Sequence, residues 1–307
     1  MRILVVGAGG TGGYFGGRLL EAGRDVTFLV RPRRAAQLAE HGLVIASVTG
    51  DVHLPAPPTV QADALREPFD LVLLSCKAYD LDDAIASFAP AVGPQTVILP
   101  LLNGMRHVDV LDARFGADAV LGGLCMIVST LDDDGTIRHM TPMASIVFGE
   151  RDGTRSTRSE AVARELAAGR FDSRRSDAIV QEMWDKWVFI ATGAGLTCLM
   201  RATVGEIEAA GGAPFAISLY DECAAIATHA GYTPSDGVRE RTSTMFTAPR
   251  SSLTASMYRD LERGGRTEGD HLLGDLLRRG TRADDPTSIL RAAHVHVAAY
   301  EIRRAAS

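Results

Sequence analysis

The sequence is poor in lysine and in asparagine. Lysine occurs twice, at Lys77 and Lys186, against thirty arginines, and asparagine occurs once, at Asn103. An ammonium group can lose its proton when it is partly desolvated, whereas a guanidinium effectively cannot. Both lysines are therefore candidates for acid–base chemistry. The alternative is that they are surface lysines whose stems lie along apolar neighbours.

Cysteine is scarce too, and long hydrophobic runs are missing. The four cysteines lie far apart without CxxC spacing, which predicts reduced core thiols, a reducing compartment and no zinc site. The eight histidines form no HxxxH or HExxH pattern, so we expect no bound metal. No stretch approaches the roughly 20 apolar residues of a membrane span. We therefore expect a soluble, cytoplasmic protein that does not enter a membrane.

The chain also lacks an excess of positive charge. Its formal net charge is -6, which gives no electrostatic reason to expect binding to nucleic acid. The length of 307 residues exceeds what one small core needs and favours two domains.

The first part of the chain alternates short apolar runs with helical patterns. The runs cover residues 3–6, 26–30, 71–75, 97–101 and 120–124, which is typical of a parallel sheet with crossover helices. Residues 44–48 and 52–54 predict an inserted hairpin, and the runs 126–130, 136–140 and 146–148 predict added antiparallel strands. The pattern indicates an α/β Rossmann domain.

Beyond Gly149 the sequence becomes rich in arginine and serine, and strand-like runs are expected to stop. Helical patterns follow at 179–190, 214–230, 256–262, 271–279 and 287–300. We therefore expect two domains, residues 1–168 for NADP and residues 169–307, mostly α-helical, for substrate and catalysis. The boundary falls near residues 165–172.

A glycine-rich turn follows the first apolar run. Its residues, Gly7, Ala8, Gly9, Gly10, Thr11 and Gly12, spell GxGxxG between a strand and a helix expected to begin near Tyr14. In this context the first glycine permits the tight turn, the second lets the backbone approach a pyrophosphate, and the third allows close helix packing. The pyrophosphate is expected at the positive helix N-terminus.

The end of the second apolar run carries arginine where NAD-binding folds carry an acid. The segment Phe28-Leu29-Val30-Arg31-Pro32-Arg33 has no acidic residue for a ribose 2′-hydroxyl. Arg31, with Arg33 or Arg34, suits the 2′-phosphate of NADP(H). The alternative is a solvated basic loop.

With these parts assembled, the chain resembles the ketopantoate reductase family over nearly its whole length. The resemblance rests on the N-terminal GAGGTGGYFGGRL, Cys76-Lys77-Ala78, Leu102-Asn103-Gly104-Met105, Trp184-Asp185-Lys186-Trp187, and Ser256-Met257-Tyr258-Arg259-Asp260 leading to Thr267-Glu268. It implies NADPH-dependent reduction of 2-dehydropantoate to (R)-pantoate, a step of pantothenate and coenzyme A biosynthesis.

The resemblance also implies roles for individual residues. Lys186 and Glu268 are expected to be catalytic, with Lys186 as the general acid that protonates the developing alkoxide. Lys77 is expected at the cofactor, Asn103 and Glu268 at both cofactor and substrate, and Ser256 at the substrate. Both lysines and the single asparagine thus fall on site positions. A homodimer is left open.

The chain departs from the family pattern in the substrate pocket. Ile190 and Ala194, four and eight residues after Lys186, stand where the family usually has substrate-binding asparagines, and Leu253 replaces another. On a helix, Ile190 and Ala194 share the face of Lys186 and line the pocket. The alternatives are therefore a related dehydrogenase for a less hydroxylated 2-keto acid, or a non-catalytic NADP-sensing protein, against which Lys186 and Glu268 argue.

Overall fold

The protein is described by a computed structural model that covers residues 1–281 and 283–306. It divides into two compact units. The first comprises residues 1–102 and 107–180, and the second comprises residues 103–106 and the chain from 181 onward.

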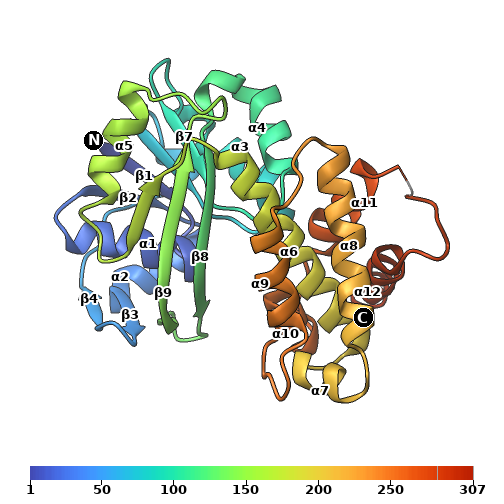
Figure 1. Ribbon diagram of the computed structural model, residues 1–307. Helices are drawn as coiled ribbons and strands as arrows, with labels where there is room; N and C mark the ends of the chain where they lie inside the picture. The colour runs from blue at the N-terminus through green and yellow to red at the C-terminus, as the bar shows by residue number, and fades with distance from the viewer. Residues whose placement is uncertain (282, 307) are drawn as a thin grey trace. The chain divides into compact units, whose positions relative to one another are not determined.

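The first unit is built on a parallel sheet (Figure 1). Its strands, in the order β5-β2-β1-β6-β7, are β1 (Arg2–Val6), β2 (Asp25–Leu29), β5 (Thr59–Val60), β6 (Leu71–Leu74) and β7 (Val97–Pro100). All neighbours pair in parallel. On β1, Ile3 and Val5 join one hydrophobic cluster while Leu4 and Val6 join another. Both faces of the sheet are therefore buried, as parallel sheets require.

A second sheet completes this unit. It contains β3 (Leu43–Ser47), β4 (Val52–Leu54), β8 (Gly122–Leu131), β9 (Ile137–Gly149) and β10 (Asp172–Arg175). β3 and β4 form the predicted antiparallel hairpin, β8 pairs with β9 antiparallel, and β3 and β10 pair with β9 in parallel. The helices are α1 (Gly10–Glu21), α2 (Pro32–His41), α3 (Leu81–Phe88), α4 (Arg106–Phe115) and α5 (Thr157–Leu166).

Helix α1 packs against strands of both sheets. A Cβ atom at Gly16 would lie 2.7 Å from the ring of Phe28 on β2, and one at Gly13 would lie 2.4 Å from Ile137 on β9. Real Cβ contacts are longer, so larger residues at these positions would push the sheets away. The glycines of α1 therefore serve packing as well as the turn that precedes the helix.

The second unit is helical. It contains most of α6 (Ile179–Met200), then α7 (Val204–Ala209), α8 (Ala213–His229), α9 (Asp236–Phe246), α10 (Ser256–Glu262), a π-helical segment (Asp270–Gly274), α11 (Asp275–Arg279) and α12 (Ile289–Ala306). From Ala191 to Cys198, every residue of α6 is buried. The buried hydroxyls of Thr192 and Thr197 donate to carbonyls one turn earlier, so they bury no unpaired polar group.

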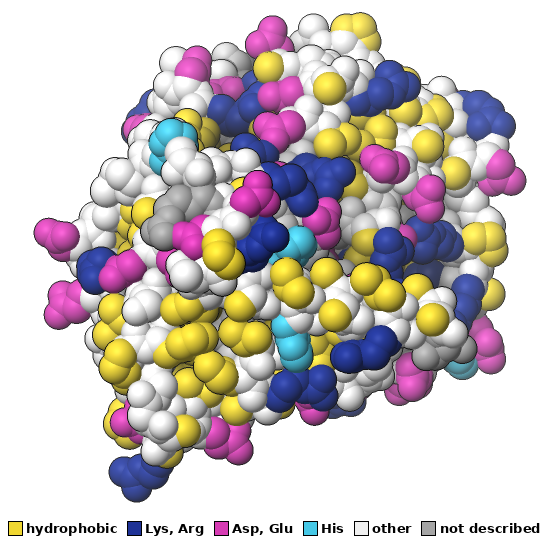
Figure 2. All heavy atoms as spheres, turned by 90° about the vertical axis from the view of Figure 1, so that its right-hand side faces the viewer, with side chains coloured by type: hydrophobic (Ala, Val, Ile, Leu, Met, Phe, Trp, Pro, Cys, Tyr) yellow, Lys and Arg dark blue, Asp and Glu magenta, His cyan; other side chains and the backbone are white. Residues whose placement is uncertain are grey.

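The surface of this unit mixes charged and apolar side chains. On the face shown in Figure 2, hydrophobic side chains gather over a broad area between charged ones. Helix α12 leaves Val295 and Ile302 exposed. Within the described part of the chain, no helix is both long enough and apolar enough to cross a membrane.

The predicted fold class, a Rossmann-like domain followed by a helical region, is confirmed. The predicted antiparallel strands are confirmed, because β8 pairs with β9 antiparallel, but the bounds of several elements were wrong. The run 126–130 lies on β8, and the run 120–124 covers the turn before β8 and the first residues of that strand. In this turn, Val120 forms an isolated parallel bridge with Ile98 of the first sheet. The runs 136–140 and 146–148 are one strand, β9. Strands do not stop at Gly149, because the polar β10 pairs with β9. β10 lies beyond residue 168, where we place the domain boundary, and that boundary stays a prediction.

Helix predictions also needed correction. Helices α5, α7 and α9 were not predicted, and α1 begins at Gly10 rather than near Tyr14. The pattern at 271–279 covers most of the π-helical segment and then α11. The four cysteines are free thiols, and burial raises the pKa of Cys198 and of Cys223 to about 12, which leaves both thiols protonated at neutral pH.

Candidate active site

The glycine-rich turn joins β1 to α1. Gly7 has φ +93°, a left-handed conformation that a side chain would strain. Among the described residues, no atom lies within 4 Å of the position a Cβ would take at Gly9. The helix starts at the next residue with no acid in its first turn. The turn therefore leaves room for a pyrophosphate against the positive end of α1.

Ser75, at the end of β6, fixes the other side of this turn. Its Oγ donates to the Val6 carbonyl at 2.9 Å, and a Cβ at Gly12 would lie 2.0 Å from that Oγ. Close approach of β6 therefore requires glycine at position 12. Sequence reasoning missed Ser75, although a hydroxyl at the end of an apolar strand and directly before Cys76-Lys77 was a signal.

Arg31 is the last residue before α2 and is exposed. Its Nη2 atom lies 3.1 Å from Asp80 Oδ1 and 3.8 Å from Asp83 Oδ2. The hydrogen bond and charge of Asp80 raise the pKa of Arg31, against a smaller opposing effect of burial. The end of β2 has no acidic residue of its own, but Asp80 and Asp83 from the segment after β6 lie beside it.

Arg34 has a different role from Arg31. Its Nε donates to the Ala8 carbonyl of the glycine turn at 3.0 Å, and its Nη1 donates to the Gly135 carbonyl of the β8–β9 turn, also at 3.0 Å. Burial lowers its pKa. Arg34 therefore links the glycine turn to the second sheet, which leaves Arg31 and the exposed Arg33 as the arginines open to a 2′-phosphate.

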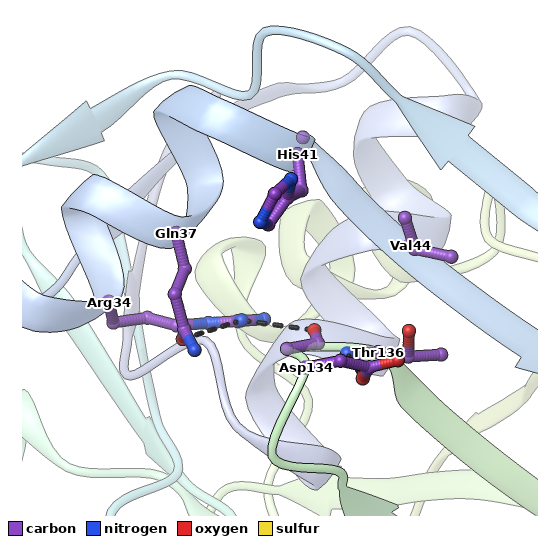
Figure 3. Close-up of a pocket in the computed structure, with 8 residues that line it drawn as sticks. Arg34, Gln37, His41, Val44, Asp134 and Thr136 are labelled. Atoms are coloured by element: carbon purple, nitrogen blue, oxygen red, sulfur yellow. Dashed lines mark hydrogen bonds between the residues drawn. The ribbon is translucent and has the colours of Figure 1, made fainter.

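A pocket of about 280 Å³ lies beside Arg34 (Figure 3). It is lined by the outer part of α2, the start of β3 and the β8–β9 turn, with Gln37, His41, Val44, Asp134 and Thr136 around it. Arg34 is the one residue of this lining that was considered for the cofactor, and no residue expected to bind substrate or to be catalytic lines the pocket. We therefore assign it no part in catalysis.

Lys77 follows β6, so it lies beyond the same edge of the parallel sheet as the glycine turn and Arg31. Its side chain is exposed, and its carbonyl accepts from the amide of Asp80 at 2.9 Å. Carboxyl ends of neighbouring parallel strands meet at one edge, where open α/β sheets bind ligands. The cofactor residues predicted within the first unit therefore share one edge.

The second unit carries Lys186, Ile190 and Ala194 on α6. Lys186 and Ile190 are partly buried, and Ala194 is 2% exposed. Spacings of four and eight residues place the three on one helix face. The structure therefore brings the candidate acid and the two apolar replacements together.

Helix α6 also binds the segments that carry Glu268 and Ser256. The buried indole of Trp187 donates to the Leu272 carbonyl at 3.0 Å, within the π-helical segment that follows Glu268. Thr197 Oγ1 accepts from the Ala255 amide at 3.4 Å, directly before Ser256, which is exposed at the start of α10. Segments of π-helix are frequent at functional sites.

Two further contacts fix the segment around Glu268. The amide and hydroxyl of Thr267 donate to Glu301 Oε1 at 2.7 and 2.8 Å. Burial opposes ionisation of Glu301, yet these bonds and that of Arg304 outweigh it and lower the pKa. Next to Glu268, the buried His271 approaches the backbone of Asn103, 2.7 Å between Nε2 and the carbonyl oxygen.

The predicted residues thus divide between the two units. The glycine turn, Arg31 and Lys77 belong to the first unit, whereas Asn103, Lys186, Ile190, Ala194, Ser256 and Glu268 belong to the second. Their roles stay predictions. Sequence reasoning missed the supporting Trp187 and His271, although Trp187 belongs to the quoted Trp-Asp-Lys-Trp motif.

Two family models match the chain. The model described as ketopantoate reductase PanE/ApbA matches residues 3–153, and the model of the C-terminal region of the same family matches residues 178–301. The chain belongs to the ketopantoate reductase family. The predicted family resemblance is therefore confirmed.

Individual relatives span the whole chain. The chain is 38% identical over 305 residues to the uncharacterized oxidoreductase YkpB of Bacillus subtilis (strain 168), covering 99% of this chain and 100% of that protein. The 2-dehydropantoate 2-reductase structure from Geobacter metallireducens GS-15 has a TM-score of 0.87 at 27% identity, covering 97% and 99% of the two chains. A D-mandelate dehydrogenase with NADH and anilino(oxo)acetate shares the fold, with a TM-score of 0.88, 22% identity, and 99% and 100% covered.

As a member of the ketopantoate reductase family, the chain is an oxidoreductase. The family comprises 2-keto acid reductases that bind a nicotinamide cofactor. The glycine turn of this chain fits such a cofactor, because Gly9 leaves open space and Gly12 allows β6 to approach.

Proposed function

We propose that this chain catalyses NADPH-dependent reduction of a 2-keto acid, with 2-dehydropantoate as substrate and (R)-pantoate as product. The observation that carries the proposal is the surroundings of Lys186 on α6. Its neighbour Trp187 donates a hydrogen bond to the segment that follows Glu268. The helix of the candidate acid Lys186 and the segment of Glu268, the carboxylate expected to bind the substrate, are therefore joined by a hydrogen bond.

The preference for NADPH rests on Arg31. Its guanidinium follows β2, where an NAD-binding fold carries an acid, and it is exposed for a bidentate contact with a 2′-phosphate. Such a phosphate has to displace Asp80 and Asp83 from Arg31. Cofactor choice is therefore expected to depend on both carboxylates as well as on Arg31.

The chemistry divides between cofactor and protein. When bound, the cofactor supplies hydride to the carbonyl carbon of the keto acid. Lys186 donates a proton to the oxygen atom, whose negative charge its ammonium also stabilises. Asn103, Ser256 and Glu268 bind and orient the substrate through hydrogen bonds, and Asn103 and Glu268 also contact the cofactor.

A second candidate is a 2-keto acid with an alkyl side chain, and the apolar residues on α6 favour it. Ile190 and Ala194 offer no hydrogen bond to a substrate hydroxyl, and Leu253 is apolar as well. An unpaired buried hydroxyl costs roughly 1–3 kcal/mol. Loss of several partners would therefore shift preference away from a hydroxylated substrate.

The test is a panel of 2-keto acids, including 2-dehydropantoate and its deoxy analogue, with NADPH and NADH as cofactors. Loss of reduced-cofactor absorbance measures turnover, and chiral chromatography identifies the product. We expect turnover with NADPH. Cofactor binding without turnover of any 2-keto acid would instead support the NADP-sensing alternative.

We also propose a cytoplasmic location. The four free, well-separated thiols suit a reducing compartment. The domain division proposed above assigns cofactor binding to residues 1–168 and substrate binding and catalysis to residues 169–307.

A further inference from the structure

The imidazole of His271 lies between the segment of Asn103 and that of Glu268. It is only 7% exposed, and its Nε2 atom lies 2.7 Å from the Asn103 carbonyl oxygen. A carbonyl oxygen can only accept, so Nε2 must carry the hydrogen. His271 therefore donates a buried hydrogen bond to the backbone of the only asparagine in the chain.

The Asn103 segment is shaped to fit this ring. Gly104 has φ +76°, and a Cβ there would lie 3.1 Å from Nε2 and 3.2 Å from Cδ2 of His271. Both the conformation and the close approach exclude a larger residue. The ring is thus closely packed against the Asn103–Gly104 backbone as well as hydrogen-bonded to it.

A second contact joins the same two segments but is weaker. Arg106 Nη1 lies 3.2 Å from Asp270 Oδ2, with side chains 52% and 61% exposed. Exposed ion pairs contribute little, because water and salt screen them. Of these two contacts, the buried bond of His271 is therefore the stronger link between the Asn103 turn and the π-helical segment.

The ring also lies within electrostatic reach of Glu268. Glu268 stands three residues before His271 and its carbonyl accepts from the Leu272 amide at 2.9 Å, so the two side chains share one side of a helical turn. Burial lowers the pKa of His271. The hydrogen bond to the Asn103 backbone and the charges of Glu268 and Asp275 oppose this effect, and the charge of Arg106 adds to it. The ring is consequently neutral at neutral pH, with its hydrogen on Nε2.

We propose that His271 is a positioning residue that holds Asn103 in register with Glu268 for substrate binding. The inference rests on the proposed function, which assigns both residues to the substrate. It predicts that the donor at the Nε2 position matters, since a ring that only filled space would not need it.

The test compares His271→Leu, which removes the donor, with His271→Gln, whose amide nitrogen reaches the position of Nε2. We expect His271→Leu to lower kcat/KM for the 2-keto acid by at least about tenfold, the equivalent of one buried hydrogen bond. His271→Gln should recover most of this loss. The dissociation constant of NADPH should change by a smaller factor than kcat/KM, because Asn103 supplies only one of the proposed cofactor contacts, whereas the glycine turn and Arg31 belong to the other unit.

A double-mutant cycle separates positioning from a general loss of stability. If His271 acts through Asn103, then His271→Leu adds little to the loss already caused by Asn103→Ala. His294→Leu is the matched control. The partly buried His294 also lies next to the π-helical segment, with 3.7 Å between its Nε2 and Asp270 Oδ1, and its replacement should leave kcat/KM unchanged. Additive losses, or equal losses in the Leu and Gln variants, would overturn the proposal.

Hydrogen exchange gives a readout that needs no turnover. Amides 104–106 should exchange faster in His271→Leu than in wild type and at the wild-type rate in His271→Gln. Unchanged exchange in His271→Leu overturns the inference. Absence of 2-keto acid turnover in the wild type would instead contradict the proposed function, and the exchange experiment would still decide the role of His271.

Discussion

Arg31, after β2, and Asp80, in the segment after β6, form an ion pair with 3.1 Å between Nη2 and Oδ1. The residues are 49 positions apart in the sequence and meet because β2 and β6 both flank β1. The pair places an acid beside the arginine expected at the 2′-phosphate. We therefore expect selection between NADPH and NADH to depend on competition between a carboxylate and a phosphate for one guanidinium.

The first prediction concerns this competition. Arg31→Ala should remove most of a preference for NADPH that we expect to be about tenfold or more, since a charge-assisted phosphate contact contributes roughly 1.5–3 kcal/mol. Asp80→Asn should increase the preference by freeing Arg31. Fluorescence titration with both cofactors measures this. Arg34→Ala is the control, because it should weaken the binding of NADPH and of NADH by the same factor. Equal affinities of the wild type for the two cofactors would refute the role of Arg31 at the 2′-phosphate.

The second prediction concerns the general acid. An arginine at position 186 can stabilise an oxyanion but cannot readily supply the proton. Lys186→Arg should therefore bind NADPH normally and lose about 100-fold or more in kcat. Stopped-flow measurement of cofactor oxidation separates the chemical step from product release. A variant with near wild-type kcat would show that another group donates the proton.

The third prediction concerns the apolar wall of α6. A 2-keto acid with an alkyl side chain should be reduced with a kcat/KM at least comparable to that for 2-dehydropantoate, because the wall rewards apolar area and not a hydroxyl. Ile190→Asn should shift the ratio toward 2-dehydropantoate. A wild-type preference for 2-dehydropantoate above about 100-fold over its deoxy analogue would contradict this, since it needs a dedicated hydrogen-bond partner.

The fourth prediction concerns Trp187. Replacing it with Phe removes the indole donor and leaves the buried Leu272 carbonyl without that bond, so the free energy of unfolding should fall by about 1–3 kcal/mol. Urea denaturation measures the change. Trp184→Phe is the control: that ring stacks on Tyr232 and Phe keeps an aromatic surface there, so the loss should be smaller. Equal decreases in the free energy of unfolding for the two variants would show that the lost side-chain volume, and not the hydrogen bond, accounts for the effect of Trp187→Phe.

The fifth prediction is the pH dependence of stability. Burial lowers the pKa of both His271 and His294 in the folded state below the value of 6.5 expected when unfolded. As pH falls below 6.5, the unfolded chain binds protons that the folded chain resists, so the free energy of unfolding should decrease. Denaturation at several pH values tests this. His271→Gln should reduce the slope, and an unchanged slope would mean that this ring does not titrate there.

The parallel sheet was predictable because its signal is local. Apolar residues of β1 alternate between two buried clusters, and a glycine turn directly follows the strand, so composition and order suffice. β10 was not predictable. Its sequence, Asp-Ser-Arg-Arg, has no apolar pattern, and it becomes a strand by pairing with β9 at the edge of the sheet.

The same contrast holds for the site. Lys77, Lys186 and Asn103 became candidates because each residue type is rare in this chain, and their roles stay predictions. The hydrogen bonds of Trp187 and His271 could not be predicted in this way. Trp187 and Leu272 are 85 positions apart in the sequence, and His271 and Asn103 are 168 positions apart. Composition and spacing carry no information on such contacts, which depend on how the helices pack.

The glycines of α1 have a consequence for folding. Five of its twelve residues are glycine, and each lowers helix stability by about 1 kcal/mol relative to alanine. Such a segment has almost no intrinsic tendency to be helical and gains its helicity from the strands that enclose it. We therefore expect the phosphate-binding turn at its start to become ordered only when strands that enclose the helix, including β9 far along the chain, have packed against it.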